Sequence, residues 1–514
     1  MNRPNANQPP RQNAGVFVRT PARVQDECPR PHPIGTTAAV MTIAIALLTL
    51  QGQYPADIAA YGAKFTAAAL VFSLLFDVQR GISNLIRADI LAMLAFYFLT
   101  LFEFLFPQTM FNTMARSDSA TIATQVVLIT FIGMLLGRHL IHPKKQPFQR
   151  ILTYEIPAGI LVLLFWIAFC VGYLHQWSAP AVSWNPIKWI DFSMAARFEQ
   201  PWGRKKFGDL DALLYELNML INLLPPLAGI ILARRQRFGG ISLILVMLAY
   251  LLTLFLAFCG GTRNVLATYL VTFVIGYAFS SPKGRKTELL VVSSAATALL
   301  IFGTFTMIHI RTIGLKKYIA GELPFAAGRS DSLYVDYNLY NISKLTEVFP
   351  NRMPHLGLEI AYLAAIRPIP RALWPGKPEG LSNSIEKALG YEQGNITISA
   401  SCAGEAYMAG GILGALFCGI LFGAINGWWS HLASPRNSEL GILIYSSGFF
   451  AAVISMRSVF TYTTALLPTV AAILGTVYLV RYLAEKARRS AFLGGNKARQ
   501  LNRTARPQPR PPQA

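Results

Sequence analysis

The chain has 514 residues, of which 53% are hydrophobic and only 14% are charged, and its formal net charge is +21. A soluble protein carries about one quarter charged residues, and its core does not need the long uninterrupted apolar runs seen here. The composition therefore argues against a soluble globular protein, and the continuous runs disfavour a membrane β-barrel, whose strands alternate. We expect an all-α polytopic integral membrane protein.

Both ends of the chain are basic and poor in core-forming residues. Residues 1–33 are rich in Pro, Asn, Gln and Arg, and residues 494–514, within the basic tail at 481–514, repeat that composition. Such segments are typical of disordered tails beside an anionic inner leaflet. The positive charge thus points to a membrane surface and not to nucleic acid, and the N-terminus lacks the pattern of a secretory signal peptide.

Twelve apolar segments are long enough to cross a bilayer core of about 30 Å as helices. Nine fall within residues 34–308 and three within residues 403–480. Alternate short connections are rich in Lys and Arg, whereas the other short connections carry at most one such residue. Because short basic loops stay in the cytoplasm, both termini are expected there. The segments lie near residues 34–51, 58–76, 88–106, 119–141, 156–174, 212–232, 241–259, 264–279, 289–308, 403–424, 440–456 and 461–480.

Two outer connections are too long for the charge rule to apply. The medium loop, residues 175–211, holds four of the eight tryptophans of the chain. The large loop, residues 309–402, holds three short helical patterns, at 330–347, 356–366 and 382–389. In the first pattern Tyr334, Tyr337 and Tyr340 would form a stripe on one helix face. These aromatic side chains would either stack on sugar rings or form an interfacial belt.

A proline-rich arm follows the second helical pattern of the large loop, with the sequence IRPIPRALWPGKPEG at residues 366–380. Its prolines remove backbone donors and push the preceding residues towards extended conformations. We therefore expect a rigid extended arm that holds Arg367, Arg371 and Lys377 just outside the membrane. Trp374 would anchor the arm at the interface or stack on a sugar.

Basic side chains on the outer face are the first candidates for chemistry, because the charge rule predicts their depletion there. Arginine presents a planar fork of donors that matches phosphate oxygens, so a converging set would bind a diphosphate without a metal. Pairing with lipid head groups or nearby carboxylates explains any single one as well. The candidates are Arg263, Arg311, Arg329, Arg352, Arg367, Arg371, Lys377 and Arg457.

Acidic residues are the second set of candidates. Glu405 lies in SCAGEAYMAGG, near the start of an expected span. Either the helix dipole favours a carboxylate there, or Glu405 is a base or an orienting group at the outer mouth of the bundle. Asp209 and Asp211 in GDLD would chelate a metal or simply begin a helix, and we expect no metal site and no cofactor. Weaker candidates are His309, Asp331, Asp336 and Glu359.

Three stretches resemble one family. IPRALWPGKP, at 369–378, resembles the signature of the Wzy-type oligosaccharide repeat unit polymerases, the O-antigen polymerase family. There an Ile-Pro-Arg, an apolar-Trp pair and a Lys-Pro recur in this order outside the cytoplasm. GEAYMAGGILGALFCGILFG, at 404–423, resembles the segment that follows, and GGTRN, at 260–264, resembles a Gly-x-Arg turn that opens an earlier span. The chain departs from the family in its long basic tails and in Gly376, where a polar residue is expected.

The resemblance implies a glycosyltransferase of GT-C-like architecture in the bacterial inner (plasma) membrane. The growing O-antigen or exopolysaccharide, held on undecaprenyl diphosphate, would pass to the non-reducing hydroxyl of a new lipid-linked repeat. A chain-length regulator and a flippase are the implied protein partners, beside membrane lipids. The leading hypothesis gives catalytic roles to Glu405, Arg371 and Arg263. The expected substrate-binding residues are Arg311, Arg367, Trp374, Lys377, Arg457 and Tyr337.

Two alternatives stay open. An O-antigen ligase passes finished polymer to a lipid core, and it shares the donor and the need for cations. A flippase for lipid-linked sugars would need charges deep within the spans, where the sequence has few, chiefly Lys64 and Glu103.

Overall fold

A computed structural model shows a helical protein. It describes residues 30–80, 82–141, 143, 148–197, 199–202, 214, 216–282, 285–322, 337–369, 373–374, 376–378, 399–434, 437–483 and 485. Over these residues the chain forms helices, turns and loops, and no strand occurs among them. The predicted all-α class is therefore confirmed for the described part of the chain.

Six helices of the described chain are long and apolar enough to cross a membrane. Each of the twelve predicted apolar segments contains helix, but their crossing of the membrane twelve times stays a prediction. The six long helices are α2 (Pro55–Gln79), α5 (Ser117–Gly137), α12 (Gly240–Cys259), α14 (Lys286–Ile313), α19 (Ser401–Ser430) and the stretch Val459–Leu483, which begins with α21 (Val459–Ala465). The others are α1 (Pro33–Leu48), α3 (Ala88–Thr100), α7 (Ala158–Gly172), η3 (Asn218–Leu223) running into α11 (Leu224–Ala233), α13 (Arg263–Ser280) and α20 (Glu439–Ile454).

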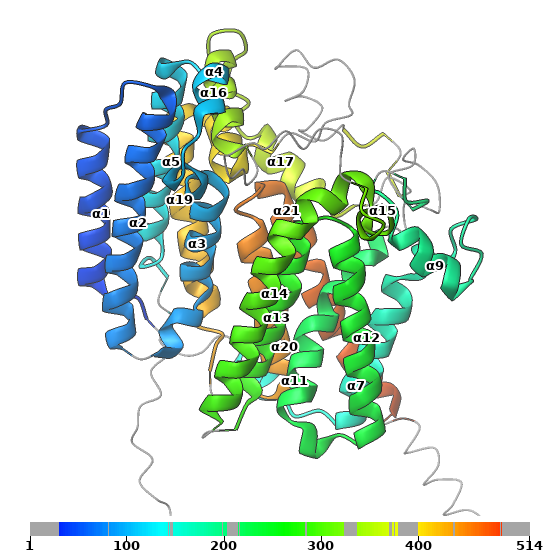
Figure 1. The fold of residues 1–514 in the computed structure, drawn as a ribbon. Coiled ribbons are helices and arrows are strands. Elements are labelled where there is room, and N and C mark those ends of the chain that lie inside the picture. The colour runs from blue at the N-terminus through cyan, green and yellow to red at the C-terminus, as the bar shows by residue number, and fades with distance from the viewer. Residues whose placement is uncertain are drawn as a thin grey trace, which may run out of the picture.

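Short helices fill the connections between these elements. They are η1 (Ile82–Ile86), η2 (Phe102–Leu105), α4 (Thr109–Met114), α6 (Gln149–Leu152), α8 (Leu174–Trp177), α9 (Pro186–Ser193), η4 (Arg235–Arg237), α15 (Leu315–Ile319), α16 (Asn338–Val348) and α17 (Glu359–Ile366). Helices α9, α15, α16 and α17 gather at one end of the molecule, the upper end of Figure 1, which we call the outer end.

The long helices form two groups, seen side by side in Figure 1. The first group contains α1, α2, α3, α5 and α19, and the second contains α7, α11, α12, α13 and α14. Each group encloses its own buried apolar core, with Phe96 and Phe131 in the first and Phe165 and Leu227 in the second. Helix α20 packs against both α3 and α13, and so it joins the two groups.

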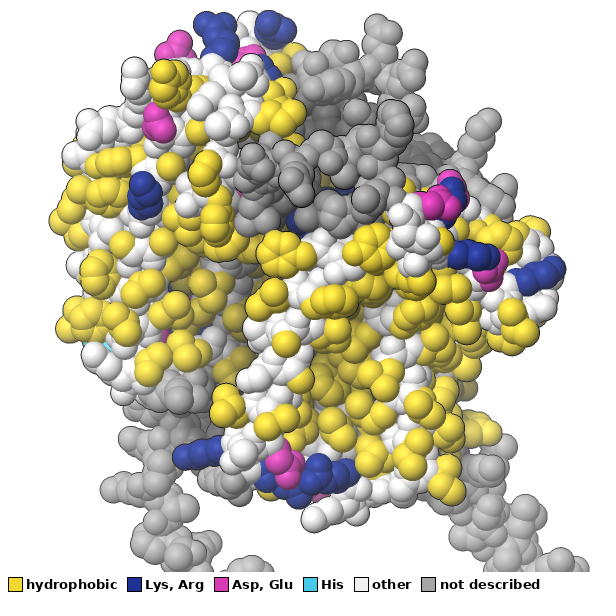
Figure 2. Space-filling model, in the orientation of Figure 1, with side chains coloured by type: hydrophobic (Ala, Val, Ile, Leu, Met, Phe, Trp, Pro, Cys, Tyr) yellow, Lys and Arg dark blue, Asp and Glu magenta, His cyan; other side chains and the backbone are white. Residues whose placement is uncertain are grey.

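The sides of the molecule are apolar and its ends are charged. Figure 2 shows hydrophobic side chains over the middle of this face, with most of the charged side chains above and below them. On α14, Leu290 is 66% exposed and Phe302 is 59% exposed. An apolar surface of this extent is costly in water and is what lipid requires.

Helices α5 and α19 approach each other through glycines. A Cβ atom placed on Gly133 would lie 2.6 Å from the carbonyl oxygen of Leu416, and one on Gly427 would lie 2.7 Å from that of Arg138. Small residues allow helix backbones to pack closely inside a membrane, where the hydrophobic effect does not drive helices together. Within the glycine-rich segment at 404–423, Gly419 and Gly423 lie equally close to the backbone of α5 at Thr130 and Met134, so this segment has a packing role.

Helix α19 is folded back on itself near its start. Gly410 and Gly411 have non-helical backbone angles, and Sγ of Cys418 lies 4.0 Å from the carbonyl oxygen of Cys402. Sixteen residues of straight helix would separate these two residues by about 24 Å. Residues 401–409 thus run back along the longer arm, residues 411–430, and the expected span at 403–424 is interrupted.

Two helices expected in the large loop differ from the prediction in the residue at which they begin. The pattern at 330–347 gives α16, which begins at Asn338 after Tyr337 at a left-handed φ of 52°, and residues 330–336 lie outside the described residues. Tyr337 therefore does not share a helix face with Tyr340, and the predicted tyrosine stripe is wrong at this position. The pattern at 356–366 gives α17 from Glu359, after Gly357 at a φ of 54°. The pattern at 382–389 and Tyr334 lie outside the described residues.

Candidate functional site

Glu405 is buried in the short arm of α19, at the level where α21 begins. Its Oε2 accepts a hydrogen bond from the N–H of Val459 over 2.6 Å, and the Ser458 hydroxyl and the Phe460 N–H are further donors. A buried carboxylate is tolerated when donors of this kind replace its hydration. The carboxylate of Glu405 therefore accepts hydrogen bonds from the first turn of another helix, α21, and not from the start of its own helix.

The bonds around Glu405 fix the segment that carries Arg457. The N–H of Cys402 donates to the carbonyl oxygen of Met456 over 3.1 Å, and the Ser399 hydroxyl donates to that of Arg457 over 3.3 Å. Together with the bond from Val459 to Glu405, these contacts attach residues 456–459 to the short arm of α19. The half-buried Arg457 side chain thus starts from a backbone that is held on both sides.

The proline-rich arm closes back on α17. Nζ of Lys377 donates to the carbonyl oxygen of Arg367 over 2.9 Å and to that of Ile369 over 2.8 Å. Carbonyls beyond the last turn of a helix lack helical partners, and a lysine ammonium is a natural donor to them. The expectation of a fully extended arm is therefore wrong for its described residues, because the Lys377 side chain reaches back to the start of the arm.

Arg367 connects this arm to both helix groups. Its exposed guanidinium is an electrostatic neighbour of Glu405 in the first group and of Glu216, which precedes η3 of the second group. The hydroxyl of Thr463 in α21 donates to the carbonyl oxygen of Ala364 in α17 over 2.7 Å. Trp374 is half-buried against the core of the first group. We name the residues Arg367, Glu405 and Arg457 the Glu405 region.

A second basic region lies where α13 begins and α14 ends. Gly261 has a φ of 63°, and a Cβ atom there would lie 2.9 Å from Cα of Arg311. Glycine is thus required at position 261 of the GGTRN turn for two reasons: its left-handed backbone conformation and the close approach of α14. The N–H of Arg197 donates to the carbonyl oxygen of Arg311 over 3.4 Å. This arginine corner consists of Arg197, Arg263 and Arg311, and Arg197, a residue of the medium loop, was not among the candidate site residues predicted from the sequence.

The remaining expected site residues belong neither to the Glu405 region nor to the arginine corner. Tyr337 is exposed before α16, which packs on α3, α5 and α19. Arg352 and Glu359 are exposed in the large loop. Over the described residues, no three His, Cys, Asp or Glu side chains lie close enough to hold a metal ion. Outside the described residues lie Asp209, Asp211, Arg329, Asp331, Asp336, Arg371 and the side chain of His309.

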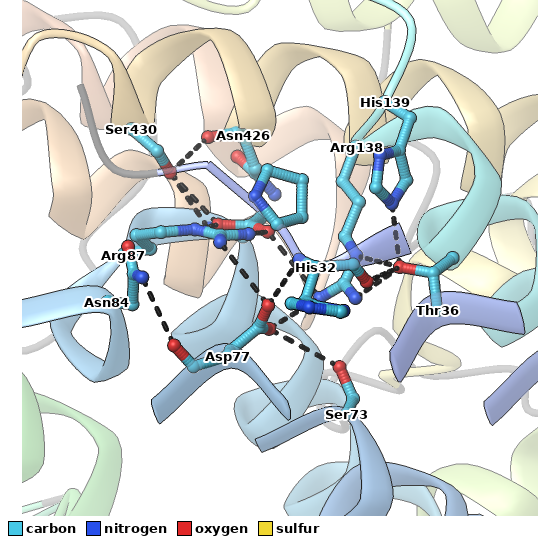
Figure 3. Close-up of polar contacts among 12 residues, drawn as sticks. His32, Thr36, Ser73, Asp77, Asn84, Arg87, Arg138, His139, Asn426 and Ser430 are labelled. Carbon is cyan, nitrogen blue, oxygen red and sulfur yellow. Dashed lines mark hydrogen bonds and ion pairs between the residues drawn. The ribbon is translucent and has the colours of Figure 1, made fainter. Parts of the chain in front are cut away.

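A buried ion network at the opposite, inner end was missed by the sequence analysis (Figure 3). Arg138 lies 3.2 Å from Asp77, and Arg87 lies 3.7 Å from Asp77 and also pairs with Asp89. None of these four side chains is more than 2% exposed. The hydroxyl of Ser430 donates to Asp89 over 3.0 Å.

The inner-end network joins five helices of the first group. Asp77 belongs to α2, Asp89 to α3 and Ser430 to α19, while Arg138 follows α5. The N–H of His32, directly before α1, donates to Asp77 over 2.6 Å. Arg87 and Arg138 fall in the short basic connections that the sequence analysis used only to predict sidedness. The signal that it did not use was the pair of aspartates within otherwise apolar helices.

Comparison with known proteins gives no further guide to this site. No protein-family model, no curated protein and no solved structure matches the chain. The geometry and the chemistry of the residues are therefore the basis for any function.

Proposed function

We propose that the chain is a glycosyltransferase that polymerises undecaprenyl-diphosphate-linked oligosaccharide repeats at the outer face of a bacterial inner membrane. The growing glycan would leave its lipid diphosphate and join the non-reducing hydroxyl of a new lipid-linked repeat. This proposal keeps the twelve-span plan, the GT-C-like architecture and the cytoplasmic placement of both termini.

One observation carries most of the proposal. The two longest stretches that resemble the polymerase family are separated by residues 379–403. Arg367, two residues before the first stretch, and Glu405, within the second, are electrostatic neighbours. Arg457 is held beside Glu405 by the contacts of residues 456–459. One cation, Arg367, thus acts on the carboxylate at the outer end, and the backbone of a second, Arg457, is held close to it.

We assign phosphate binding to Arg367 and Arg457. Arginine pairs with phosphate oxygens through two parallel hydrogen bonds, and preorganised cations stabilise the charge that develops on a departing diphosphate. Glu405 is a positioning residue in this scheme, because its hydrogen bonds hold the start of α21. Arg371 keeps its proposed catalytic role and is tested directly by Arg371→Ala.

The arginine corner supplies cations for the second lipid-linked substrate. Arg263 and Arg311 come from different helices and are brought together by the glycine turn at Gly261. A polymerase needs a diphosphate site for the acceptor as well as for the donor, since both are lipid-linked. A hydroxyl of the acceptor would attack, and its proton would pass to a nearby carboxylate or His.

The decisive experiment supplies a single purified lipid-linked repeat to the protein in proteoliposomes. Elongation of this one substrate to a ladder of products supports a polymerase. A requirement for a separate lipid-core acceptor would identify a ligase, and movement of the repeat across the bilayer without a covalent product would identify a flippase. Either of these two outcomes overturns the proposal.

A further inference from the structure

Helix α9 is held firmly by one of its faces. Asn185 caps it, accepting hydrogen bonds from the N–H of Ile187 over 2.9 Å and from that of Lys188 over 3.3 Å. On the inner face, Trp189 is buried, and its Nε1–H donates to Gln176 over 2.9 Å. Its ring also contacts Trp177 edge to face. The orientation of α9 is therefore fixed by caps and buried aromatic contacts.

The exposed side of α9 and the turn before it carry large apolar side chains. Trp184 is 63% exposed and Ile187 is 78% exposed. Trp184 reaches the surface from a left-handed φ of 62°, a conformation that is uncommon for a bulky residue. Helix α9 projects from the outer end of the second group, beside α15 (Figure 1).

Helix α15 extends this exposed surface. Nζ of Lys316 pairs with Asp191 of α9 over 2.8 Å, and Ile319, one turn after Lys316, is 72% exposed. The lysines Lys188 and Lys317 are exposed on the same two helices. We name Trp184, Ile187, Ile319, Lys188 and Lys317 the α9–α15 patch.

We propose that the α9–α15 patch inserts into the head-group layer of the outer leaflet and binds anionic phospholipid there. Tryptophan prefers the membrane interface, isoleucines gain from partial insertion, and lysines reach phosphate groups while their alkyl chains stay in the apolar layer. The patch continues the lipid-suited surface of α14, because α14 runs into α15 through Gly314. Its charge complements a phospholipid head group.

The α9–α15 patch is rigidly connected to the arginine corner. The N–H of Lys316 donates to the carbonyl oxygen of Met194 over 3.3 Å. Gly314, at a φ of 82°, packs so closely that a Cβ atom would lie 2.6 Å from the backbone nitrogen of Ala196. Arg197 follows directly and bonds to Arg311. The anchor thus sets the depth of the arginine corner, a consequence that rests on the proposed function.

The test measures the depth of Trp184 without using glycan transfer. The full chain and its Trp184→Phe variant are placed in nanodiscs that contain phosphatidylglycerol, with bromines either near the head group or deep in the acyl chains. Brominated lipid quenches tryptophan at short range. We expect shallow bromines to quench the full chain more than the variant, and deep bromines to quench both to the same extent.

Two outcomes overturn the anchor. One is equal quenching of both proteins by shallow bromines. The other is aqueous iodide removing the whole fluorescence difference between them, as expected if Trp184 faces water, a glycan or a protein partner. Lys188→Gln with Lys317→Gln supplies a second measure, since the shallow quenching should then no longer rise with the fraction of phosphatidylglycerol. Because no reaction is measured, failure of the anchor leaves the polymerase proposal standing, and the reverse also holds.

Discussion

The backbone N–H of Val459 donates a hydrogen bond to Oε2 of Glu405 over 2.6 Å. These residues are 54 positions apart, and their bond attaches the first turn of α21 to the short arm of α19. Arg457 stands two residues before Val459, so the geometry of this cation depends on the buried carboxylate. In the proposed scheme Glu405 therefore acts through Arg457, by holding the backbone that carries it.

Glu405→Gln and Glu405→Ala separate a positioning role from proton transfer. The Gln side chain keeps an oxygen that accepts from Val459, so we expect glycan transfer close to that of the unmodified chain. Ala removes the acceptor, and transfer should fall on the order of 10- to 100-fold, since a hydrogen bond to a charged group contributes roughly 1.5–3 kcal/mol. Initial rates with purified lipid-linked repeat give the comparison. Equal loss in both variants would instead make Glu405 the proton acceptor.

Arg457→Ala should reduce transfer on the order of 10- to 100-fold by removing one charge-assisted contact to a diphosphate. Arg457→Lys should recover only part of the activity, because an ammonium cannot reproduce the planar fork. Arg116→Ala is the matched control, since Arg116 is exposed at the N-terminus of α5 and lies outside both basic regions. A similar loss in the Arg116 variant would point to general surface charge and remove the specific role of Arg457.

Lys377→Met tests whether this residue closes the arm. The ammonium donates to the carbonyl oxygens of Arg367 and Ile369, so its removal should open the arm and expose it to protease. We expect faster cleavage within residues 367–378, measured by mass spectrometry of timed digests. Lys317→Met, which changes an exposed lysine of α15, should leave this rate unchanged. Unaltered cleavage of the Lys377 variant would return Lys377 to the set of candidate phosphate ligands.

The length of the apolar runs predicted where the helices lie, whereas the sidedness inferred from charge alternation stays a prediction. Apolar runs longer than those needed in a soluble protein core can be recognised directly in the sequence, and each of the twelve predicted apolar segments contains helix. The fold-back at Gly410 and Gly411 was not predicted, because the apolar composition continues through it and two glycines also occur within membrane helices. It became visible only when Cys402 and Cys418 were found side by side.

The candidate site was predicted only in part, because its contacts join residues that no local sequence pattern connects. Proline content indicated a stiff arm, but Lys377 closes it by bonding backbone carbonyls that no sequence pattern identifies. The paired charges at the inner end were hidden because Asp77 and Arg138 are 61 residues apart. Residue types gave the candidates, whereas long-range packing decided which of them meet.

Asp89→Asn should destabilise the first helix group. Breaking a buried ion pair leaves an uncompensated charge and costs about 3–5 kcal/mol, so the midpoint of thermal unfolding in detergent should fall clearly. In the double variant Asp89→Asn with Arg87→Gln, the unfolding midpoint should fall by less than the sum of the decreases in the two single variants, because both members of the ion pair are then removed together. Arg80→Gln, an exposed neighbour of the inner-end network, is the control. An unchanged midpoint for Asp89→Asn would show that the network does not hold the helices.

Gly133→Ala tests the close approach of α5 and α19. The new Cβ atom would lie 2.6 Å from the carbonyl oxygen of Leu416 and 2.9 Å from Cα of Gly419, and both are backbone atoms that can yield only if the helices separate. We expect a lower midpoint of thermal unfolding. Separation would also shift Ser430 away from Asp89, so labelling of a cysteine introduced at the inner end of α19 should increase. Gly159→Ala is the matched control, because nothing lies within 4 Å of its Cβ position in α7, and alanine favours helix by up to about 1 kcal/mol. If Gly133→Ala were as harmless as Gly159→Ala, glycine packing would not be what joins the two helices.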